Sequence, residues 1–584
     1  MAQIEVDRTE NPSDEITLPR FVVLKSNHNN KYLSYTNISE ENVDQVPTGF
    51  LKFSGEEVGS HYAKFEVEMA KSCENKGLVH IRCCYNNKYW VRLLRTNTPE
   101  DDHWIVAKAN EPEEDRSKSS CTLFEPIITV EELNDPVLNE EDDNDAISDG
   151  ENDVAEQHQV HNDGNGDDEE DNDNDNDNDN EHDNNNRRVH AGRNRFDRKR
   201  MLVRLRHVQL GHYTRLWKDN ENIQHLMGGL STSPDNNTNN NTDVNSNNTD
   251  ESSMCDVCTV IDWGSLVIFP KHVAFKGDNG AFLTSDWRGW NANLEYEGED
   301  FRGAQVAHEI FTNPDGSIRI KSDNLGKFWC RRPGDPDWIL PDSDDPTRND
   351  TLFQPIKIDD NEFALRNMGN FNICKRYTLG CMVGFTANVP NIPIFAHLRI
   401  EEVVRSRIVY NVSYRLMQAR IYDYQNEIEI ATGEAVNLTQ ETTGMTFKLP
   451  YKNTKRVSWN DARTLSMKSG GVKTTMQAGV PMIGEDGKLA ISSSGFNCGS
   501  TIIKWGEVET WETAVQNVCK VVVPAMTTVE VSLIANRASY EVPFNYSRRD
   551  TRTNGQISNN DMDDGIYTGF NFFNFNYNIK QKNL

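Results

Sequence analysis

Aromatic rings beside side-chain amides are the feature of this chain that most suggests binding chemistry. The stretch HIRCCYNNKYWVRL, residues 80–93, sets Tyr89 and Trp90 beside Asn86 and Asn87. A ring can stack on the face of a pyranose while amides bind its hydroxyl groups. The same residues also suit a core strand, on which Tyr89 and Trp90 alternate and at most one of them faces inward. The stretch is therefore a candidate sugar site, and packing of a hydrophobic core is the alternative.

A repeated pattern must position these residues, because similar stretches occur six times. Each copy has an apolar alternating run, a basic residue, a short Asn/Gly-rich segment and an aromatic residue, which is typical of strand, turn and strand. The copies lie at 21–33, 80–93, 203–217, 273–283, 318–332 and 364–377. They form two groups of three, with repeats of about 40–50 residues. Three copies per group favour two three-fold β-barrels over propeller blades.

The negative charge of the chain is concentrated in one segment. Residues 131–186 contain 24 Asp or Glu and no Lys or Arg, so the net charge of −30 becomes −6 without them. Alternating Asp and Asn at 167–186 cannot bury apolar surface, which predicts disorder. The segment is either a tolerated loop insertion or a binder of cations or basic proteins. The basic run at 187–200 is either a nuclear localisation patch or an electrostatic partner of the acidic run.

Targeting and cysteine patterns favour an intracellular protein. The first 15 residues, MAQIEVDRTENPSDE, have neither the basic nor the apolar region of a secretory signal. No apolar run approaches the roughly 18 residues of a membrane helix. The sequence thus predicts synthesis as a cytoplasmic or nuclear protein that becomes membrane-associated only if a pore forms. Cys255 and Cys258 form a C-x-x-C pair with no matching second pair, so no metal site and no cofactor are predicted.

The repeats resemble the amaranthin family of plant lectins, whose unit is the agglutinin domain. The similarity rests on LPRFVVLKSNHNNKYLS, KGLVHIRCCYNNKYWVRL, FPKHVAFKGDNGAFLTS and FWCRR, and covers about 18–262 and 263–395. It implies two tandem β-trefoil domains and a site for N-acetylgalactosamine-containing glycans, notably Gal-GalNAc, where domains of two subunits meet. Asn87, Tyr89 and Trp90 fall on the KYW segment of the family, so they are the candidate carbohydrate-binding residues. The second domain has GKFWC at this position and lacks the asparagine.

A different pattern begins near residue 398, where long alternating runs replace the repeats. RIVYNVSYRL, residues 407–416, places Ile408, Tyr410 and Val412 on one apolar face, which predicts a long amphipathic strand of an antiparallel sheet. Residues 479–484, GVPMIG, are predicted to form an apolar turn between polar arms, although turns normally expose polar residues. Such a hairpin suits a strand pair that later crosses a bilayer within a closed barrel. The alternative is a core-facing loop of an ordinary β-sandwich.

Residues 399–584 also look like an aerolysin-type pore-forming module. The similarity rests on SWNDARTLSMKSGGVKTTMQAGVPMIGEDGKLAIS, WGEVET and VVVPAMTTVEVSLIANRASYEVPFNY. Carried over, Val480, Pro481, Met482 and Ile483 would be the tip of the pore hairpin. Amaranthin domains joined to such a module are similar to the Hessian-fly-responsive wheat proteins, which implies a role in plant defence.

The predicted fold class is all-β, with two tandem β-trefoils followed by an elongated antiparallel aerolysin-like domain. The predicted parts are a disordered tail (1–17), a first trefoil (18–262) with a disordered acidic insertion (130–200) and a polar loop (229–254), a second trefoil (263–398) and the pore-forming module (399–584).

The predicted function is a lectin that brings a pore-forming module to membranes bearing N-acetylgalactosamine-containing glycans, as a homo-oligomer and without a nucleic-acid partner. The alternative is a cytosolic or nuclear lectin whose C-terminal module mediates oligomerisation only. Enzymatic activity is not predicted. Acid pairs such as Glu297/Glu299 and Asp342/Asp344 lie in turn-like segments with no catalytic spacing nearby.

Overall fold

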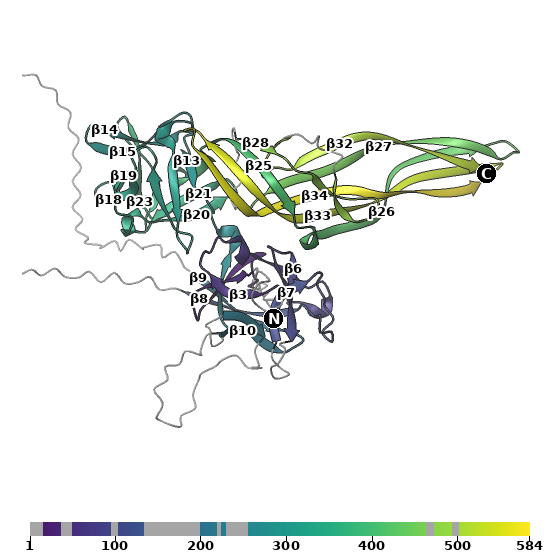
Figure 1. Ribbon diagram of the computed structural model, residues 1–584, viewed down its shortest axis with the longest axis horizontal. Helices are drawn as coiled ribbons and strands as arrows, with labels where there is room; N and C mark the ends of the chain where they lie inside the picture. The colour runs from purple at the N-terminus through teal and green to yellow at the C-terminus, as the bar shows by residue number, and fades with distance from the viewer. Residues whose placement is uncertain are drawn as a thin grey trace, which may run out of the picture. The chain divides into compact units, whose positions relative to one another are not determined.

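Three large β-sheets account for most of the described chain in a computed structural model (Figure 1). The structure describes residues 16–36, 49–94, 103–132, 199–218, 224–228, 255–462, 472–492 and 501–584. Nearly all of these belong to one compact unit, 1–131 with 200–584. The acidic insertion, the polar loop at 229–254 and most of the N-terminal tail lie outside the described residues.

Helices are limited to single 3-10 turns within the described ranges, and none of them is long and apolar enough to cross a membrane. These turns are η1 (His61–Ala63), η2 (Cys73–Asn75), η3 (Trp263–Ser265), η4 (Ala304–Val306), η5 (Asn349–Thr351), η6 (Ile394–Ala396) and η7 (Leu416–Gln418).

The first sheet has twelve strands in the order β10-β11-β3-β2-β1-β12-β9-β8-β5-β6-β7, with β4 paired to β1 and β5. Additional pairings of β10 with β9 and β11 with β7 link its ends back into the sheet. Its strands are β1 (Phe21–Ser26), β2 (Tyr32–Tyr35), β3 (Leu51–Gly55), β4 (Phe65–Met69), β5 (Val79–Cys83), β6 (Lys88–Leu94), β7 (His103–Ala109), β8 (Phe124–Glu132), β9 (Lys199–His207), β10 (His212–Lys218), β11 (Gln224–Gly228) and β12 (Cys258–Asp262).

The second sheet repeats this arrangement with twelve strands in the order β14-β15-β23-β19-β18-β17-β16-β13-β24-β21-β20, with β22 paired to β21 and β23. Its strands are β13 (His272–Gly277), β14 (Phe282–Arg288), β15 (Asn291–Gly298), β16 (His308–Thr312), β17 (Ile318–Ser322), β18 (Phe328–Arg332), β19 (Trp338–Ser343), β20 (Phe353–Asp359), β21 (Glu362–Asn367), β22 (Ile373–Leu379), β23 (Met382–Val389) and β24 (Leu398–Glu402).

The six sequence copies form six equivalent hairpins, three in each of these sheets. Each hairpin turn contains one residue with a positive φ, and the basic residue of the copy pairs with the residue two positions after it. In the first copy, Asn30 has the positive φ and Lys25 pairs with Tyr32. The turn residues are Asn30, Asn87, Gly211, Gly280, Gly326 and Phe371, with φ between 55° and 79°. Asparagine and glycine tolerate this left-handed conformation best, which explains their place in the repeat. The sixth copy differs from the expected alignment, because Phe371 is the turn residue and Ile373 takes the aromatic position.

Each of the first two sheets encloses an aromatic core. Trp90 in the first sheet packs edge-on against Phe65 and Phe124, with ring centroids 5.2 Å and 5.8 Å away. Trp329 occupies the matching place in the second sheet, beside Phe275 at 5.0 Å. Both tryptophans have no exposed surface. The expected pair of β-trefoils is confirmed, and the KYW and KFW motifs supply the central core residue of each.

The core of the second trefoil also contains a histidine that makes its stability depend on pH. His308 is completely buried beside Trp329, and burial lowers its pKa to about 3. An unfolded histidine binds its proton near pH 6.5. Protons therefore favour the unfolded state below that pH, and by pH 4 the loss of unfolding free energy is about 3 kcal/mol. Thermal unfolding at pH 7.5 and pH 4.5 should show a smaller acid-induced shift for His308→Gln than for the wild type. An equal shift in both proteins would contradict this role.

The third sheet is built mainly of long antiparallel strands, of which β26, β27, β32, β33 and β34 have fifteen or more residues each (Figure 1). Eight strands form it in the order β31-β28-β25-β33-β34-β27-β32, with β26 on β33. They are β25 (Val404–Tyr414), β26 (Arg420–Asn437), β27 (Thr443–Asn460), β28 (Lys473–Met476), β31 (Thr501–Ile503), β32 (Glu509–Val523), β33 (Thr527–Arg552) and β34 (Ile557–Asn583). A separate two-stranded hairpin, β29 (Val480–Ile483) and β30 (Leu489–Ser492), lies against this sheet. The expected all-β fold class is thus confirmed along the described chain.

Candidate functional site

The basic residue of the second repeat copy is buried in an ion pair, whereas that of the third copy, Arg206, forms a half-exposed one with Glu125. In three other copies a lysine lies over the paired ring, for example Lys276 at 5.1 Å from the Phe282 centroid. In the second copy Arg82 is buried, and its guanidinium pairs instead with the buried carboxylate of Glu66 on β4. Buried charges cost solvation free energy unless they are paired. The candidate sugar-binding segment therefore contains a buried charged cluster.

Tyr89 presents its hydroxyl to this cluster. The ring is almost fully buried, and its hydroxyl donates to Glu68 Oε2 at 2.9 Å. Burial raises the pKa of Tyr89, and the neighbouring Glu68 carboxylate raises it further. Burial also tends to raise the pKa of Glu66, but the Arg82 guanidinium outweighs it and lowers that pKa below its usual value. The cluster therefore offers the neutral hydroxyl of Tyr89 near the ionised carboxylate of Glu66, and both kinds of group can bind sugar hydroxyls.

The other two candidate residues flank Tyr89 in the turn and in the core. Asn87 holds the left-handed turn at φ 55° and accepts a hydrogen bond from Arg82 Nη1 through its Oδ1. Trp90 lies in the core, as described above, and has no exposed surface. Of the three candidates, Tyr89 is the one that lines a cavity. In the second trefoil, Gly326 takes the left-handed position of Asn87, so the missing asparagine is explained by the backbone alone.

A cavity of about 940 Å³ opens in front of Tyr89. It is lined by charged and aromatic side chains of the first trefoil and of the third sheet. Arg420 of β26 donates to Glu68 Oε1 at 2.7 Å and lies 3.4 Å from Glu66. Arg415 stacks over the ring of Tyr85 at 4.2 Å and donates to the carbonyl of the same residue. The volume suits a short oligosaccharide, since ligand pockets are usually about 300–1,000 Å³.

The residues expected at the tip of the pore hairpin lie in a strand rather than in the turn. Val480 pairs with Ser492 and Ile483 with Leu489 across β29 and β30. The turn between these strands is the polar segment Glu485–Gly487, in which Gly487 has φ 74°. A D-G pair is a strong turn signal, and it outweighs the apolar GVPMIG run. The expected apolar turn is therefore wrong for this state of the protein.

Specific side chains hold this apolar strand on the third sheet. The hydroxyls of Tyr540 and Tyr567 both donate to the Pro481 carbonyl at 3.1 Å. Asn571 accepts from Ile483 N at 3.1 Å and donates to Ile483 O at 2.9 Å. Val480 and Ile483 are buried, while Met482 is only half-buried. The sequence pattern did not point to Asn571, because its partner lies 88 residues away.

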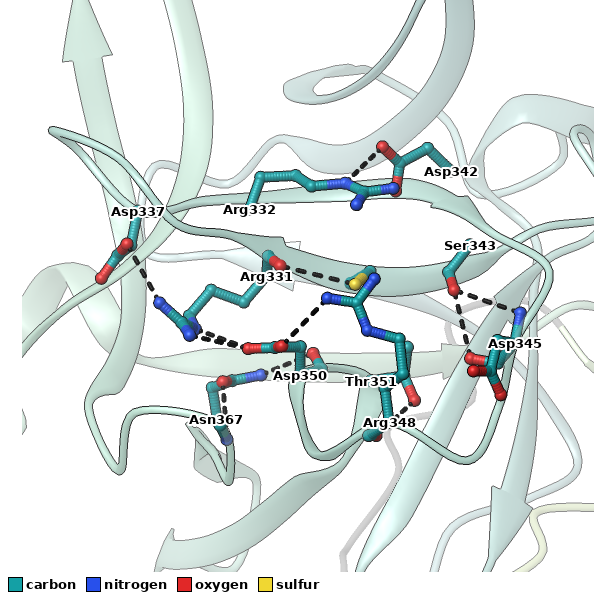
Figure 2. A network of polar contacts seen from close by, with 12 residues as sticks. Arg331, Arg332, Asp337, Asp342, Ser343, Asp345, Arg348, Asp350, Thr351 and Asn367 are labelled. Atoms are coloured by element: carbon teal, nitrogen blue, oxygen red, sulfur yellow. Dashed lines mark hydrogen bonds and ion pairs between the residues drawn. The ribbon is translucent and has the colours of Figure 1, made fainter. Parts of the chain in front are cut away.

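Ion pairs engage three carboxylates of the acid pairs in the second trefoil, Glu297, Asp342 and Asp344. Arg332 Nε donates to Asp342 Oδ2 at 2.7 Å. Figure 2 shows this contact beside a network in which Arg331 contacts Asp337 and Asp350. Asp344 pairs with Lys327. Asp342 and Asp344 are therefore bound by separate cations, which suits loop stability. Within the described ranges no cluster of three His, Cys, Asp or Glu is placed to hold a metal ion.

Comparison with known proteins identifies the first two sheets. The agglutinin domain model matches residues 16–140 and 267–389. No curated protein matches the chain. The lamprey immune protein structure is 14% identical with a TM-score of 0.27, covering 54% of this chain and all of that chain.

Two further solved structures are similar to parts of the chain. The aerolysin-like protein of Bombina maxima is 12% identical with a TM-score of 0.20, covering 30% of this chain and 99% of its own. The BEL β-trefoil is 16% identical with a TM-score of 0.20, covering 24% of this chain and 98% of its own. The two matches of the family model fall within the two trefoils, so the chain carries two agglutinin domains, one in each of its first two sheets.

Proposed function

We propose that this protein is a lectin that binds N-acetylgalactosamine-containing glycans and places a pore-forming module on the membranes that carry them. The observation that carries this proposal is that one chain contains two agglutinin domains and, after them, an apolar strand pair laid on a long β-sheet. The resemblance of residues 399–584 to aerolysin-type modules and a role in plant defence belong to the same proposal. Docking at several glycans would raise the local concentration and favour assembly of a homo-oligomer.

The sugar site of this proposal is the cavity in front of Tyr89. Asn87 sets the turn and Trp90 anchors the strand, so both act by positioning the tyrosine. Glu66 and Glu68 supply the acceptors for sugar hydroxyls. Arg420 already occupies part of this acceptor set, so a glycan would compete with it for Glu68.

Removing one hydroxyl group tests this assignment. Tyr89→Phe keeps the packed ring but loses the hydroxyl that contacts Glu68, so the affinity for a GalNAc-terminated glycan should fall several-fold, up to about tenfold. The matched control is Tyr32→Phe, which changes the equivalent residue of the first repeat copy. Isothermal titration or a glycan array would measure both. Equal affinities for the wild type and Tyr89→Phe would place the sugar elsewhere.

The complete proposal is tested by dye release from vesicles. Vesicles bearing a GalNAc-terminated glycolipid should lose dye, while plain vesicles should be far less affected at the same protein concentration. Glycan binding without dye release would favour the alternative, a lectin whose third sheet serves only in assembly. Absence of glycan binding would overturn the proposal.

A further inference from the structure

The second trefoil carries a cluster of exposed apolar side chains at one end of its barrel. Three hairpins, β14–β15, β18–β19 and β22–β23, pair with one another there, through Glu295 with Gly384 and Trp338 with Thr386. The first and third of these hairpins have apolar tips. The exposed residues and their exposed fractions are Trp287 (49%), Trp290 (97%) and Leu379 (54%), with Cys381 also exposed.

The turn geometry holds these side chains at the apex. Two-residue turns join the strands, Gly289-Trp290 in one hairpin and Gly380-Cys381 in the other. The glycines have φ of 65° and 60°, which a tight hairpin turn requires and other residues rarely adopt. Trp290 therefore sits at the apex, where it has almost no protein contact. Among the tryptophans whose side chains the structure describes, Trp287 and Trp290 are the exposed ones.

The cation beneath the first tip is engaged by carboxylates of the same hairpin. Arg288 lies between the two tryptophans in sequence, and its guanidinium contacts Glu295 at 3.2 Å and Glu297 at 2.6 Å. A sugar site needs converging polar groups that are available to the ligand, and this guanidinium is already engaged by two carboxylates. An indole combines an apolar ring with an N–H donor, which favours the boundary between lipid chains and head groups. Asp286, Glu295 and Glu297 outnumber Arg288 in this hairpin, so its charge disfavours anionic head groups and fits zwitterionic ones.

We propose that these two hairpin tips insert into the interfacial layer of a zwitterionic lipid bilayer, with Trp287 and Trp290 as the anchors. This contact does not need a glycan, and it would orient the second trefoil on the membrane surface. The strength of interfacial binding increases with the apolar area that is buried in the membrane, so the two indoles supply most of the binding free energy.

The test uses the full-length protein and phosphatidylcholine vesicles without glycolipid. The partition coefficient from co-sedimentation should fall at least about tenfold in the double variant Trp287→Ser/Trp290→Ser. The matched control is Ile394→Ser/Phe395→Ser, which removes two other exposed apolar side chains, 63% and 47% exposed, from the same domain. Brominated phosphatidylcholine should quench tryptophan fluorescence in the wild type and in the control, and much less in the double variant.

Three results would overturn the inference. The first is undetectable binding of the wild type to plain vesicles, and the second is equal binding by the wild type and the double variant. The third is release of the bound protein by free N-acetylgalactosamine, which would make the tips a sugar site. Glycan-array binding by the double variant separates this inference from the proposed lectin function. It should equal that of the wild type, because Tyr89 belongs to the other trefoil.

Discussion

Vesicles bearing a GalNAc-terminated glycolipid are expected to retain their dye when Met482 is replaced by Asp. If β29 faces lipid in the pore, a carboxylate there costs up to about 2 kcal/mol near the bilayer centre. Several subunits contribute one such strand each, so dye release should fall by about two orders of magnitude. The measurement is the initial rate of dye release at equal amounts of vesicle-bound protein.

The structure indicates why this substitution should leave the protein folded before insertion. Met482 is half-buried, and its Sδ lies 3.9 Å from Lys455 Nζ, so an aspartate there would face a cation. Ile483→Asp would be a poorer test, because Ile483 is 3% exposed and a charge would disrupt the folded form itself. Met482→Leu is the matched control and should release dye as the wild type does. Normal release by Met482→Asp would contradict a lipid-facing role for β29.

Replacing Arg407 by Ala should cause the largest loss of stability that we expect from a single charge. Arg407 is 3% exposed, and its guanidinium contacts Asp550 at 2.7 Å and Glu402 at 3.0 Å. Both carboxylates are also buried, and removing Arg407 takes away the guanidinium that they share, while Asp550 keeps its contact with Arg548 at 3.1 Å. Breaking a buried ion pair in this way costs about 3 kcal/mol or more. Differential scanning calorimetry should show the transition of the third sheet lowered by about 10 °C.

Two variants complete this test. Arg405→Ala removes an exposed arginine of the same strand and should leave the transition unchanged. Arg407→Lys keeps the charge but not the two-point contact with Asp550, so its transition should lie between those of the wild type and Arg407→Ala. If Arg407→Ala melted like Arg405→Ala, the buried cluster would not hold β25 to β33.

Local patterns were reliable where a residue's neighbours in space are also its neighbours in sequence. The Asn/Gly positions of the repeats became left-handed turns, because the turn requirement involves only a few adjacent residues. Alternation was less reliable in RIVYNVSYRL, where Val409 is buried and Ile408 is 37% exposed. A bulge between Tyr410 and Ser413, with Asn411 at φ 52°, shifts the register and breaks the period of two.

The sequence by itself determined that this protein is all-β, with two sets of three repeats followed by long strands, because hydrophobic period and turn chemistry are local properties. Only the tertiary structure decided that Trp90 packs in the core while Tyr89 reaches the cavity. Tertiary structure alone also brought Glu66 and Glu68 to Arg420, and Asn571 to Ile483. These contacts join residues 88 or more positions apart. Strand pairing and burial determine such long-range contacts, and no local sequence pattern encodes strand pairing or burial.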